Sequence, residues 1–280
     1  MPMVMREQAE LAATFAANRA RGAVMLSTRL VEGRSRRHHV AESGSLRVRC
    51  PSPETSALSA VLVNTAGGVA AGDRFDVALH AGEGSALTLT TAAAEKVYRS
   101  QGLESEIGVN LRIDDGASLN WLPQETILFD RARVSRRIDI ELAETASLLL
   151  AEIVGFGRTA MDEWVERGRF IDRWRMRRAG RLIFAETVRL DGSIGQMLSQ
   201  PAIADGGCAI ATVLIAPGDE ALIARVREVS GSFGGEVGVS AWNGFALARF
   251  CAAAAARLRA DVIAVLKAVD ADALPRLWLN

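Results

Sequence analysis

Four acidic residues occupy positions where a carboxylate could do chemistry. Glu95 follows the small residues TTAAA, Glu152 follows the apolar run LLLA, and Glu186 lies inside LIFAETVRL. Asp73 closes the glycine-rich stretch NTAGGVAAGD, residues 64–73. A carboxylate within an apolar segment is costly unless it is paired, hydrated or bound to a metal. These acids therefore have two interpretations: pairing with some of the many arginines, or a polar interior lined by carboxylates.

Alternation along LIFAETVRL places Glu186 on the same face as Phe184 and Val188. Because successive side chains of a strand point to opposite faces, this carboxylate is expected to point inward with its apolar neighbours. The sequence leaves open whether an arginine, water or a cation accompanies it there.

The glycine-rich stretch does not predict a nucleotide site. Gly67, Gly68 and Gly72 mark backbone that turns sharply or is approached closely. A Walker loop needs Lys and Ser/Thr directly after its last glycine, whereas Asp73 and Arg74 stand here. A dinucleotide fingerprint leads into a helix, yet the following RFDVALHAG alternates like a strand. We interpret the three glycines as structural turn residues.

Histidine and cysteine are too sparse and scattered for a dense metal site. The chain has three of each: His38, His39, His80, Cys50, Cys208 and Cys251. Without a CxxC pair, neither a disulfide framework nor a thiolate zinc site is predicted. Neighbouring residues of a strand face opposite ways, so His38 and His39 are poor joint ligands and are expected on a solvated loop or edge.

Paired carboxylates are also the machinery of glycoside hydrolysis. Sugar sites use aromatic platforms, however, and this chain is 5% aromatic with the single tyrosine Tyr98. A β-solenoid carbohydrate hydrolase or lyase is therefore the alternative function, and a plain scaffold without a metal role is a third.

Composition excludes several classes of protein. Lys+Arg and Asp+Glu are both 33 in 280 residues, which gives a formal net charge of zero. A nucleic-acid or anionic-membrane binder would show a basic excess. The N-terminus lacks a basic start leading into an apolar core, and no stretch approaches eighteen uninterrupted apolar residues. We expect a soluble, cytoplasmic protein.

Short strand patterns separated by turns dominate residues 22–205, and helical spacing returns in 219–230 and 245–269. The expected fold is mainly β, with a few helices toward the C-terminus. The expected organisation is an extension at 1–21, read as a short helix, and one domain at 22–280. Within that domain, 22–205 is β-rich and 206–280 contains the helices.

A faint repeat runs through the strand region. The segments GEGSALTLTT, DDGASLNWLP and AETASLLLAE align on Leu87, Leu119 and Leu148, and AGRLIFAET aligns on Leu182 as a degenerate fourth copy. Each copy is a turn, then a strand of small residues, then an acid. A period near thirty residues with one strand motif per copy suggests a solenoid of stacked β-coils.

Taken together, five motifs resemble the UreD family of urease accessory proteins, called UreH in some bacteria. They are NTAGGVAAGD, TTAAAEKVYRS, NWLPQETILFD, the apolar strand that ends in Glu152 with GFGR behind it, and the RLWLN tail. The motifs stand in the family's order and spacing over roughly residues 22–280. WLPQETILF together with the glycine turn is the most specific part.

The resemblance implies a non-enzymatic metallochaperone subunit with a mostly β, helical-solenoid fold. Such a subunit binds apo-urease and UreF, which recruits the nickel-carrying GTPase UreG, and it is required for nickel insertion. It also implies that nickel passes through an internal tunnel. The polar residues carried over for this route are Asp73, Glu95, Glu152 and Glu186; some relatives have a smaller polar residue in place of Glu95.

The chemistry of the residues agrees with transit rather than storage. Imidazole and thiolate hold nickel(II) tightly and are scarce here, whereas carboxylates and water bind it more loosely. We therefore expect no tightly bound cofactor and no tight metal site. On this hypothesis the glycine turn lets the backbone crowd a passage into which Asp73 points.

Overall fold

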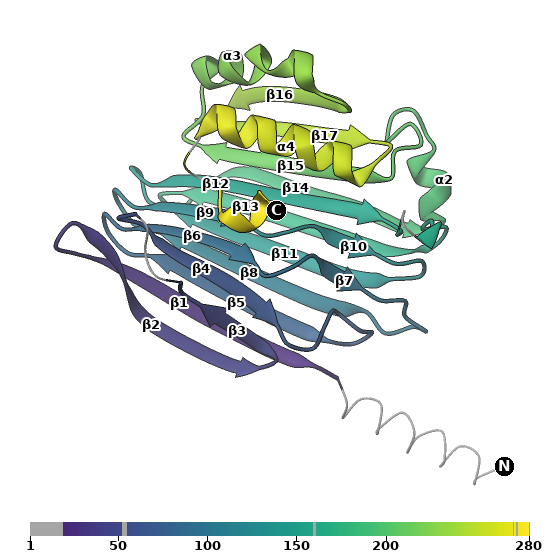
Figure 1. Cartoon of the computed structure of the whole chain (residues 1–280), viewed down its shortest axis with the longest axis horizontal. Coiled ribbons are helices and arrows are strands. Elements are labelled where there is room, and N and C mark those ends of the chain that lie inside the picture. The colour runs from purple at the N-terminus through teal and green to yellow at the C-terminus, as the bar shows by residue number, and fades with distance from the viewer. Residues whose placement is uncertain (1–18, 52–54, 159–160, 271, 273, 280) are drawn as a thin grey trace, which may run out of the picture.

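The strands of the protein form two facing sheets in the computed structural model (Figure 1). The structure describes residues 19–51, 55–158, 161–270, 272 and 274–279. Strands make up 54% of it and helices 14%, which confirms the prediction of a mainly β fold. The N-terminal extension was predicted over residues 1–21 as a short helix; residues 1–18 lie outside the described residues, and Arg21 already belongs to the first strand.

The first sheet has seven strands in the order β14-β13-β11-β8-β5-β1-β2. These strands are β1 (Arg21–Val31), β2 (Arg34–Gly44), β5 (Arg74–Ala81), β8 (Ser105–Ile113), β11 (Arg133–Leu142), β13 (Gly168–Arg178) and β14 (Arg181–Gly192). The five central strands run parallel to one another. The edge strands β2 and β14 pair antiparallel with their neighbours.

The second sheet has ten strands, eight of them in the order β16-β17-β15-β12-β9-β6-β4-β3. Its strands are β3 (Leu46–Arg49), β4 (Leu58–Asn64), β6 (Ala86–Thr91), β7 (Glu95–Val97), β9 (Ser118–Leu122), β10 (Thr126–Leu128), β12 (Ser147–Phe156), β15 (Ala209–Ala216), β16 (Glu236–Trp242) and β17 (Phe245–Ala252). The strands β4, β6, β9 and β12 are parallel. The short strands β7 and β10 pair parallel beside the end of β12.

Between β4 and β13 the chain passes alternately from one sheet to the other, so that each coil lies on the previous one. The result is a solenoid-like stack of about 4 turns. Parallel pairing follows directly, because every coil returns to the same side before it starts the next strand.

The repeat seen in the sequence corresponds to the pairing register of the parallel strands in this stack. Leu87 pairs with Leu119, and Leu119 with Leu148, on adjacent parallel strands. The prediction of a fourth copy at Leu182 was wrong. Leu182 lies in β14 of the other sheet, which runs antiparallel to β13, and it is 49% exposed. The missing copy instead precedes the others, since Leu58 pairs with Leu87. The segment TSALSA around Leu58 resembles GSALTL closely enough to have been found.

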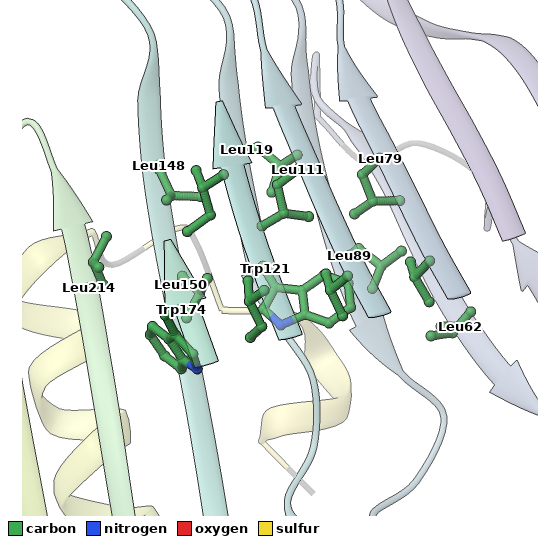
Figure 2. Packing of buried hydrophobic residues seen from close by; sticks show 14 of the residues in the cluster. Leu62, Leu79, Leu89, Leu111, Leu119, Trp121, Leu148, Leu150, Trp174 and Leu214 are labelled. Atoms are coloured by element: carbon green, nitrogen blue, oxygen red, sulfur yellow. The ribbon is translucent and has the colours of Figure 1, made fainter. Parts of the chain in front are cut away.

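Leucine is the commonest side chain in the interior between the sheets. Figure 2 shows Leu79 and Leu111 of the first sheet near Leu89 and Leu119 of the second. Each of these four side chains is at most 2% exposed. Because burying a leucine side chain contributes about 1.5–3 kcal/mol, the buried leucines of the two sheets contribute much of the favourable free energy of folding.

The C-terminal part extends the second sheet with β15, β17 and β16, all antiparallel. The helix α4 (Ala255–Val269) packs on β15 and β17, next to α3 (Glu220–Glu228), while α2 (Ile194–Leu198) follows β14 (Figure 1). The helix predicted from residue 245 thus begins only at Ala255. Residues 245–252 pair instead with β15 and β16, and this tertiary pairing overrides the helix propensity of the alanines in the segment.

The C-terminal tail is anchored through one side chain. Trp278 is 1% exposed and donates its indole N–H to the carbonyl of Leu122 at 2.9 Å. Leu279, the next residue, is 59% exposed. In the described part of the chain, no helix has the length and apolarity needed to cross a membrane.

Candidate functional site

Glu152 is buried between the two sheets. It lies on β12 of the second sheet, is 4% exposed, and accepts a hydrogen bond from the indole Nε1 of Trp121 at 2.7 Å. Its other oxygen accepts a hydrogen bond from Nη1 of Arg136, which lies on β11 of the first sheet. A charged pair therefore spans the interior from one sheet to the other.

Arg136 also binds a second carboxylate. Asp172 is its cross-strand neighbour on β13, and the two side chains join through Nε–Oδ1 at 2.9 Å and Nη2–Oδ2 at 2.5 Å. On the preceding coils the same register position is occupied by Ile107 and Phe75. The inner ion cluster, Arg136, Glu152 and Asp172, thus replaces an apolar core in the last coils.

Sequence reasoning missed Arg136 and Asp172, although a signal was present. In RVSRRIDIEL, Arg136 alternates with the apolar residues Val134 and Ile138. In GRFIDRWRM, Asp172 stands between Phe170 and Trp174 at the same spacing. Opposite charges at inward positions of consecutive strands indicate a buried ion pair.

Burial and charge pairing have opposing effects in the inner ion cluster. Desolvation raises the pKa of Glu152, and the charge of Asp172 adds to the rise, while Arg136 and Trp121 oppose it. For Arg136, burial lowers the pKa, but the two carboxylates outweigh that effect and raise it above its ordinary value. The guanidinium therefore remains charged.

A small cavity adjoins the inner ion cluster. Its volume is about 30 Å³, and its polar lining consists of Arg136, Glu152, Asp172, Glu186 and Thr212. This is room for about two water molecules and far too little for a sugar ring. Two of the four acids predicted from sequence, Glu152 and Glu186, thus meet at one inner cavity.

Glu186 is held by an arginine of the opposite sheet. It lies on β14, on the face shared with Phe184 and Val188, as predicted. Its two oxygens accept hydrogen bonds from Nη1 and Nη2 of Arg249 on β17, at 2.5 and 2.6 Å. The Glu186 side chain is 19% exposed and that of Arg249 is 52% exposed. This pair, unlike the inner one, stands at the surface.

A row of cross-strand neighbours leads from the interior to the edge of the second sheet. Glu152 pairs with Thr212, Thr212 with Arg249, and Arg249 with Gly238 of the edge strand β16. Over this row lies an open groove of about 600 Å³. Groove and inner cavity share four lining residues: Val188, Ile210, Ala211 and Thr212. The inner cavity therefore borders on a groove that is open to solvent.

Asp73 lies elsewhere, at the turn before β5. It is 3% exposed, and its two oxygens accept the backbone N–H groups of Ala20 at 2.8 Å and Ala70 at 2.7 Å. The carboxylate thereby ties the glycine turn to the segment that enters β1. Asp73 is absent from the linings of both the inner cavity and the groove.

The glycines of the turn have positive φ angles: Gly67 at 77°, Gly68 at 141° and Gly72 at 81°. A Cβ at Gly68 would lie 2.6 Å from the ring of Tyr98 and 2.8 Å from the carbonyl oxygen of Lys96. Both conformation and close approach therefore demand glycine at this position.

Glu95 begins β7, and Asn64 donates to both of its oxygens, at 3.3 and 3.2 Å. Desolvation raises the pKa of Glu95, with a smaller contribution from the charge of Asp73. The charge of Asp73 thus affects the pKa of Glu95. Neither acid lines the inner cavity or the groove. The four predicted acids form two groups.

Within the described residues, no group of three or more His, Cys, Asp and Glu side chains is arranged to hold a metal ion. His38 and His39 are exposed on β2, an edge strand, as predicted. Cys50, Cys208 and Cys251 are free thiols.

Comparison with known proteins gives a consistent result. A family model described as UreD urease accessory protein matches residues 20–279. Urease accessory protein UreD 1 of Bradyrhizobium sp. (strain ORS 278) is 65% identical over 266 residues, which cover 95% of this chain and 96% of the relative. Urease accessory protein UreD of Rhodopseudomonas palustris (strain BisB18) is 64% identical over 269 residues, covering 96% and 97%. The protein of that name from Bradyrhizobium diazoefficiens is 66% identical over 266 residues, covering 95% and 96%.

Proposed function

Because the chain belongs to the UreD family of urease accessory proteins, we propose that it takes part in nickel insertion into urease in the cytoplasm. It acts there as a non-catalytic chaperone subunit that bridges apo-urease to UreF and, through UreF, to UreG. Nickel is cargo that crosses the protein and is not kept by it.

The observation that carries this proposal is the inner cavity and its link to the groove. Its lining holds three carboxylates and one guanidinium, and Arg249 pairs with one of these carboxylates, so negative groups exceed positive ones by one when all are ionised. A cavity with this excess attracts a divalent cation and repels anions. Oxygen ligands bind nickel(II) less tightly than nitrogen or sulfur ligands, so the protein can release the ion at the end of the proposed route.

Asp73 and Glu95 supply a second group of oxygens on the same route. In support, the two are close enough for the charge of one to shift the pKa of the other. The ladder Glu95, Thr126 and Val154 links this group to β12, two residues from Glu152. We propose that nickel passes both groups in turn.

The alternative of a carbohydrate hydrolase finds little support in this geometry. Glu152 and Asp172 are both bound by Arg136, and neither is free to act as general acid or nucleophile. A glycosidase also needs room for a sugar between its carboxylates. The inner cavity of about 30 Å³ does not provide that room.

The test is urease activation in cells that lack this gene, complemented with single variants. Glu186→Gln and Asp73→Asn keep the volume of each side chain and remove its charge. Expected results are association with urease as in wild type, with lowered urease nickel content and activity. The matched control is Glu144→Gln, an exposed turn acid of the same repeat. Normal urease nickel in the Asp73→Asn/Glu186→Gln double variant would end the proposal.

A further inference from the structure

The pair Glu186–Arg249 joins the two sheets where they stop facing each other. Glu186 lies on β14, the last strand of the first sheet, whereas the second sheet continues past it with β15, β17 and β16. Arg249 belongs to this overhanging part and reaches back to Glu186 with two parallel hydrogen bonds. The pair is thus a polar contact between the last strand of the first sheet and the overhanging part, as is the hydrogen bond that Asn243 donates to the carbonyl of Ile183 at 3.3 Å.

The same pair separates the two spaces described above. Glu186 lines the inner cavity but not the groove, and Arg249 lines the groove but not the inner cavity. The four residues that line both spaces surround this boundary. The guanidinium of Arg249, bound to Glu186, therefore lies at the boundary between the groove and the inner cavity.

The exposures of the two arginines show which pair can open. The side chain of Arg136 is 6% exposed, while that of Arg249 is 52% exposed. Breaking a buried pair leaves an uncompensated charge in the interior, but a surface pair exchanges with water at little cost. The inner ion cluster is therefore fixed, and Glu186–Arg249 is movable.

Arg249 also has a second carboxylate within reach. Its cross-strand neighbour on β16 is Gly238, and Glu236 stands two residues along on the same face. Such diagonal neighbours are about 7–8 Å apart, which a long side chain spans. Glu236 is exposed, and among the described residues its carboxylate makes no hydrogen bond or ion pair, although the pKa of the neighbouring Cys251 thiol is raised by burial and, in smaller part, by the charge of Glu236.

Space for the movement is present. A Cβ placed on Gly238 would meet nothing within 4 Å, so the region beside Arg249 is open. The groups that face Arg249 from the surrounding strands are Glu186 on β14, Thr212 on β15, and Gly238 and Glu236 on β16. The guanidinium therefore has one carboxylate toward the inner cavity and another toward the groove.

We propose that Arg249 is a two-position gate for cations. Bound to Glu186 it closes the inner cavity, and bound to Glu236 it opens the cavity and frees the Glu186 carboxylate for the passing cation. This inference rests on the proposed function, because it assigns the boundary of the nickel route to one side chain.

Nickel(II) titration of the purified full chain by calorimetry tests the closed position. Arg249→Met removes a positive charge beside Glu186 and keeps most of the side-chain length. Removing one charge a few ångströms from a dication should tighten nickel binding by about tenfold. The gain should disappear in Arg249→Met/Glu186→Gln, because that variant has no freed carboxylate. The control Arg225→Met alters an exposed arginine of α3 and should bind nickel like wild type.

Two results of the titration would overturn the gate. One is unchanged nickel affinity in Arg249→Met with a wild-type circular dichroism spectrum. The other is a gain that persists in the double variant, because the tighter binding would then arise away from Glu186.

Glu236→Gln tests the open position during urease activation at limiting nickel. With its outer carboxylate gone, Arg249 stays on Glu186, and urease should acquire nickel several-fold more slowly. Gly238→Val, which fills the open space without demanding a positive φ, should slow it likewise. Wild-type rates in both variants would refute the second position. A different result would refute the proposed function itself: a normal nickel content of urease in the Glu186→Gln variant.

Discussion

The indole nitrogen of Trp121 lies 2.7 Å from Oε1 of Glu152 and donates a hydrogen bond to this buried carboxylate, whose other oxygen is bound to Arg136. Both oxygens of Glu152 are thus occupied by partners from the protein. Glu186, in contrast, is held by one half-exposed arginine. The two acids look equivalent in the sequence, yet they should respond differently to substitution.

Glu152→Leu should destabilise the fold. It removes one of the two carboxylates that neutralise buried Arg136, and we expect a loss of about 3 kcal/mol in the free energy of unfolding. Urea denaturation followed by circular dichroism measures this loss. Glu144→Leu, at an exposed turn position, is the control and should change stability little. A change below about 1 kcal/mol in Glu152→Leu would contradict a tightly coupled cluster.

Asp73→Leu should be more disruptive than Asp73→Asn. The leucine leaves the N–H groups of Ala20 and Ala70 without their acceptor, at about 1–3 kcal/mol for each that remains buried and unsatisfied. Asparagine keeps one carbonyl oxygen and loses only part of this stabilisation. The free energies of unfolding of both variants decide the point. Equal stability of the leucine and asparagine variants would show that these two hydrogen bonds contribute little.

Glu95 should make the protein less stable as the pH rises. Burial raises the pKa of Glu95 above its ordinary 4.5, so the folded state holds this proton more tightly than the unfolded state does. The associated stability is present below pH 4.5 and is lost as the pH rises from there through the raised pKa of the folded state. Glu95→Gln should flatten the pH dependence of the urea midpoint in that range. The exposed Glu83→Gln should keep the wild-type slope, and an identical slope in Glu95→Gln would refute the assignment.

Trp278→Ala should weaken the anchoring of the C-terminal tail. The substitution empties a fully buried site and removes the hydrogen bond to Leu122, at about 3–5 kcal/mol. Arg259 also loses the ring over which its guanidinium lies, 4.9 Å from the ring centre. Leu279→Ala is the matched control, because Leu279 is largely exposed, and its effect should stay within about 0.5 kcal/mol. Similar melting temperatures for the two variants would contradict this difference.

The coil stack could be predicted from the sequence because a leucine recurs at the same register position in successive coils. Leu87, Leu119 and Leu148 occupy equivalent positions on adjacent strands, as the alignment required. Leu182 broke the pattern because the chain reverses between β13 and β14 and does not form another coil. A local similarity of a few residues does not distinguish a new coil from a hairpin.

The candidate site was only half predictable. Glu152 and Glu186 were found because a carboxylate stands out in an apolar segment. Arg136 was hidden by the many arginines of the chain, and its role depends on Asp172, which lies 36 residues away in the sequence and directly beside it in the sheet. Arg249 was hidden for another reason: the alanines around it favour helix, and its strand forms by pairing with β15 and β16.

The end strands of the two main strand orders, which are β2, β14, β3 and β16, all run antiparallel to their neighbours. A stack of parallel coils would otherwise present at each end the surface on which a further parallel coil, from another copy of the chain, could polymerise. The reversed edge strands interrupt that repetition, and β2 adds exposed charges at Arg34, Arg36 and Arg37. Since the chain carries no net charge to keep copies apart, its protection against growth into fibres rests on the direction and the charges of these edges.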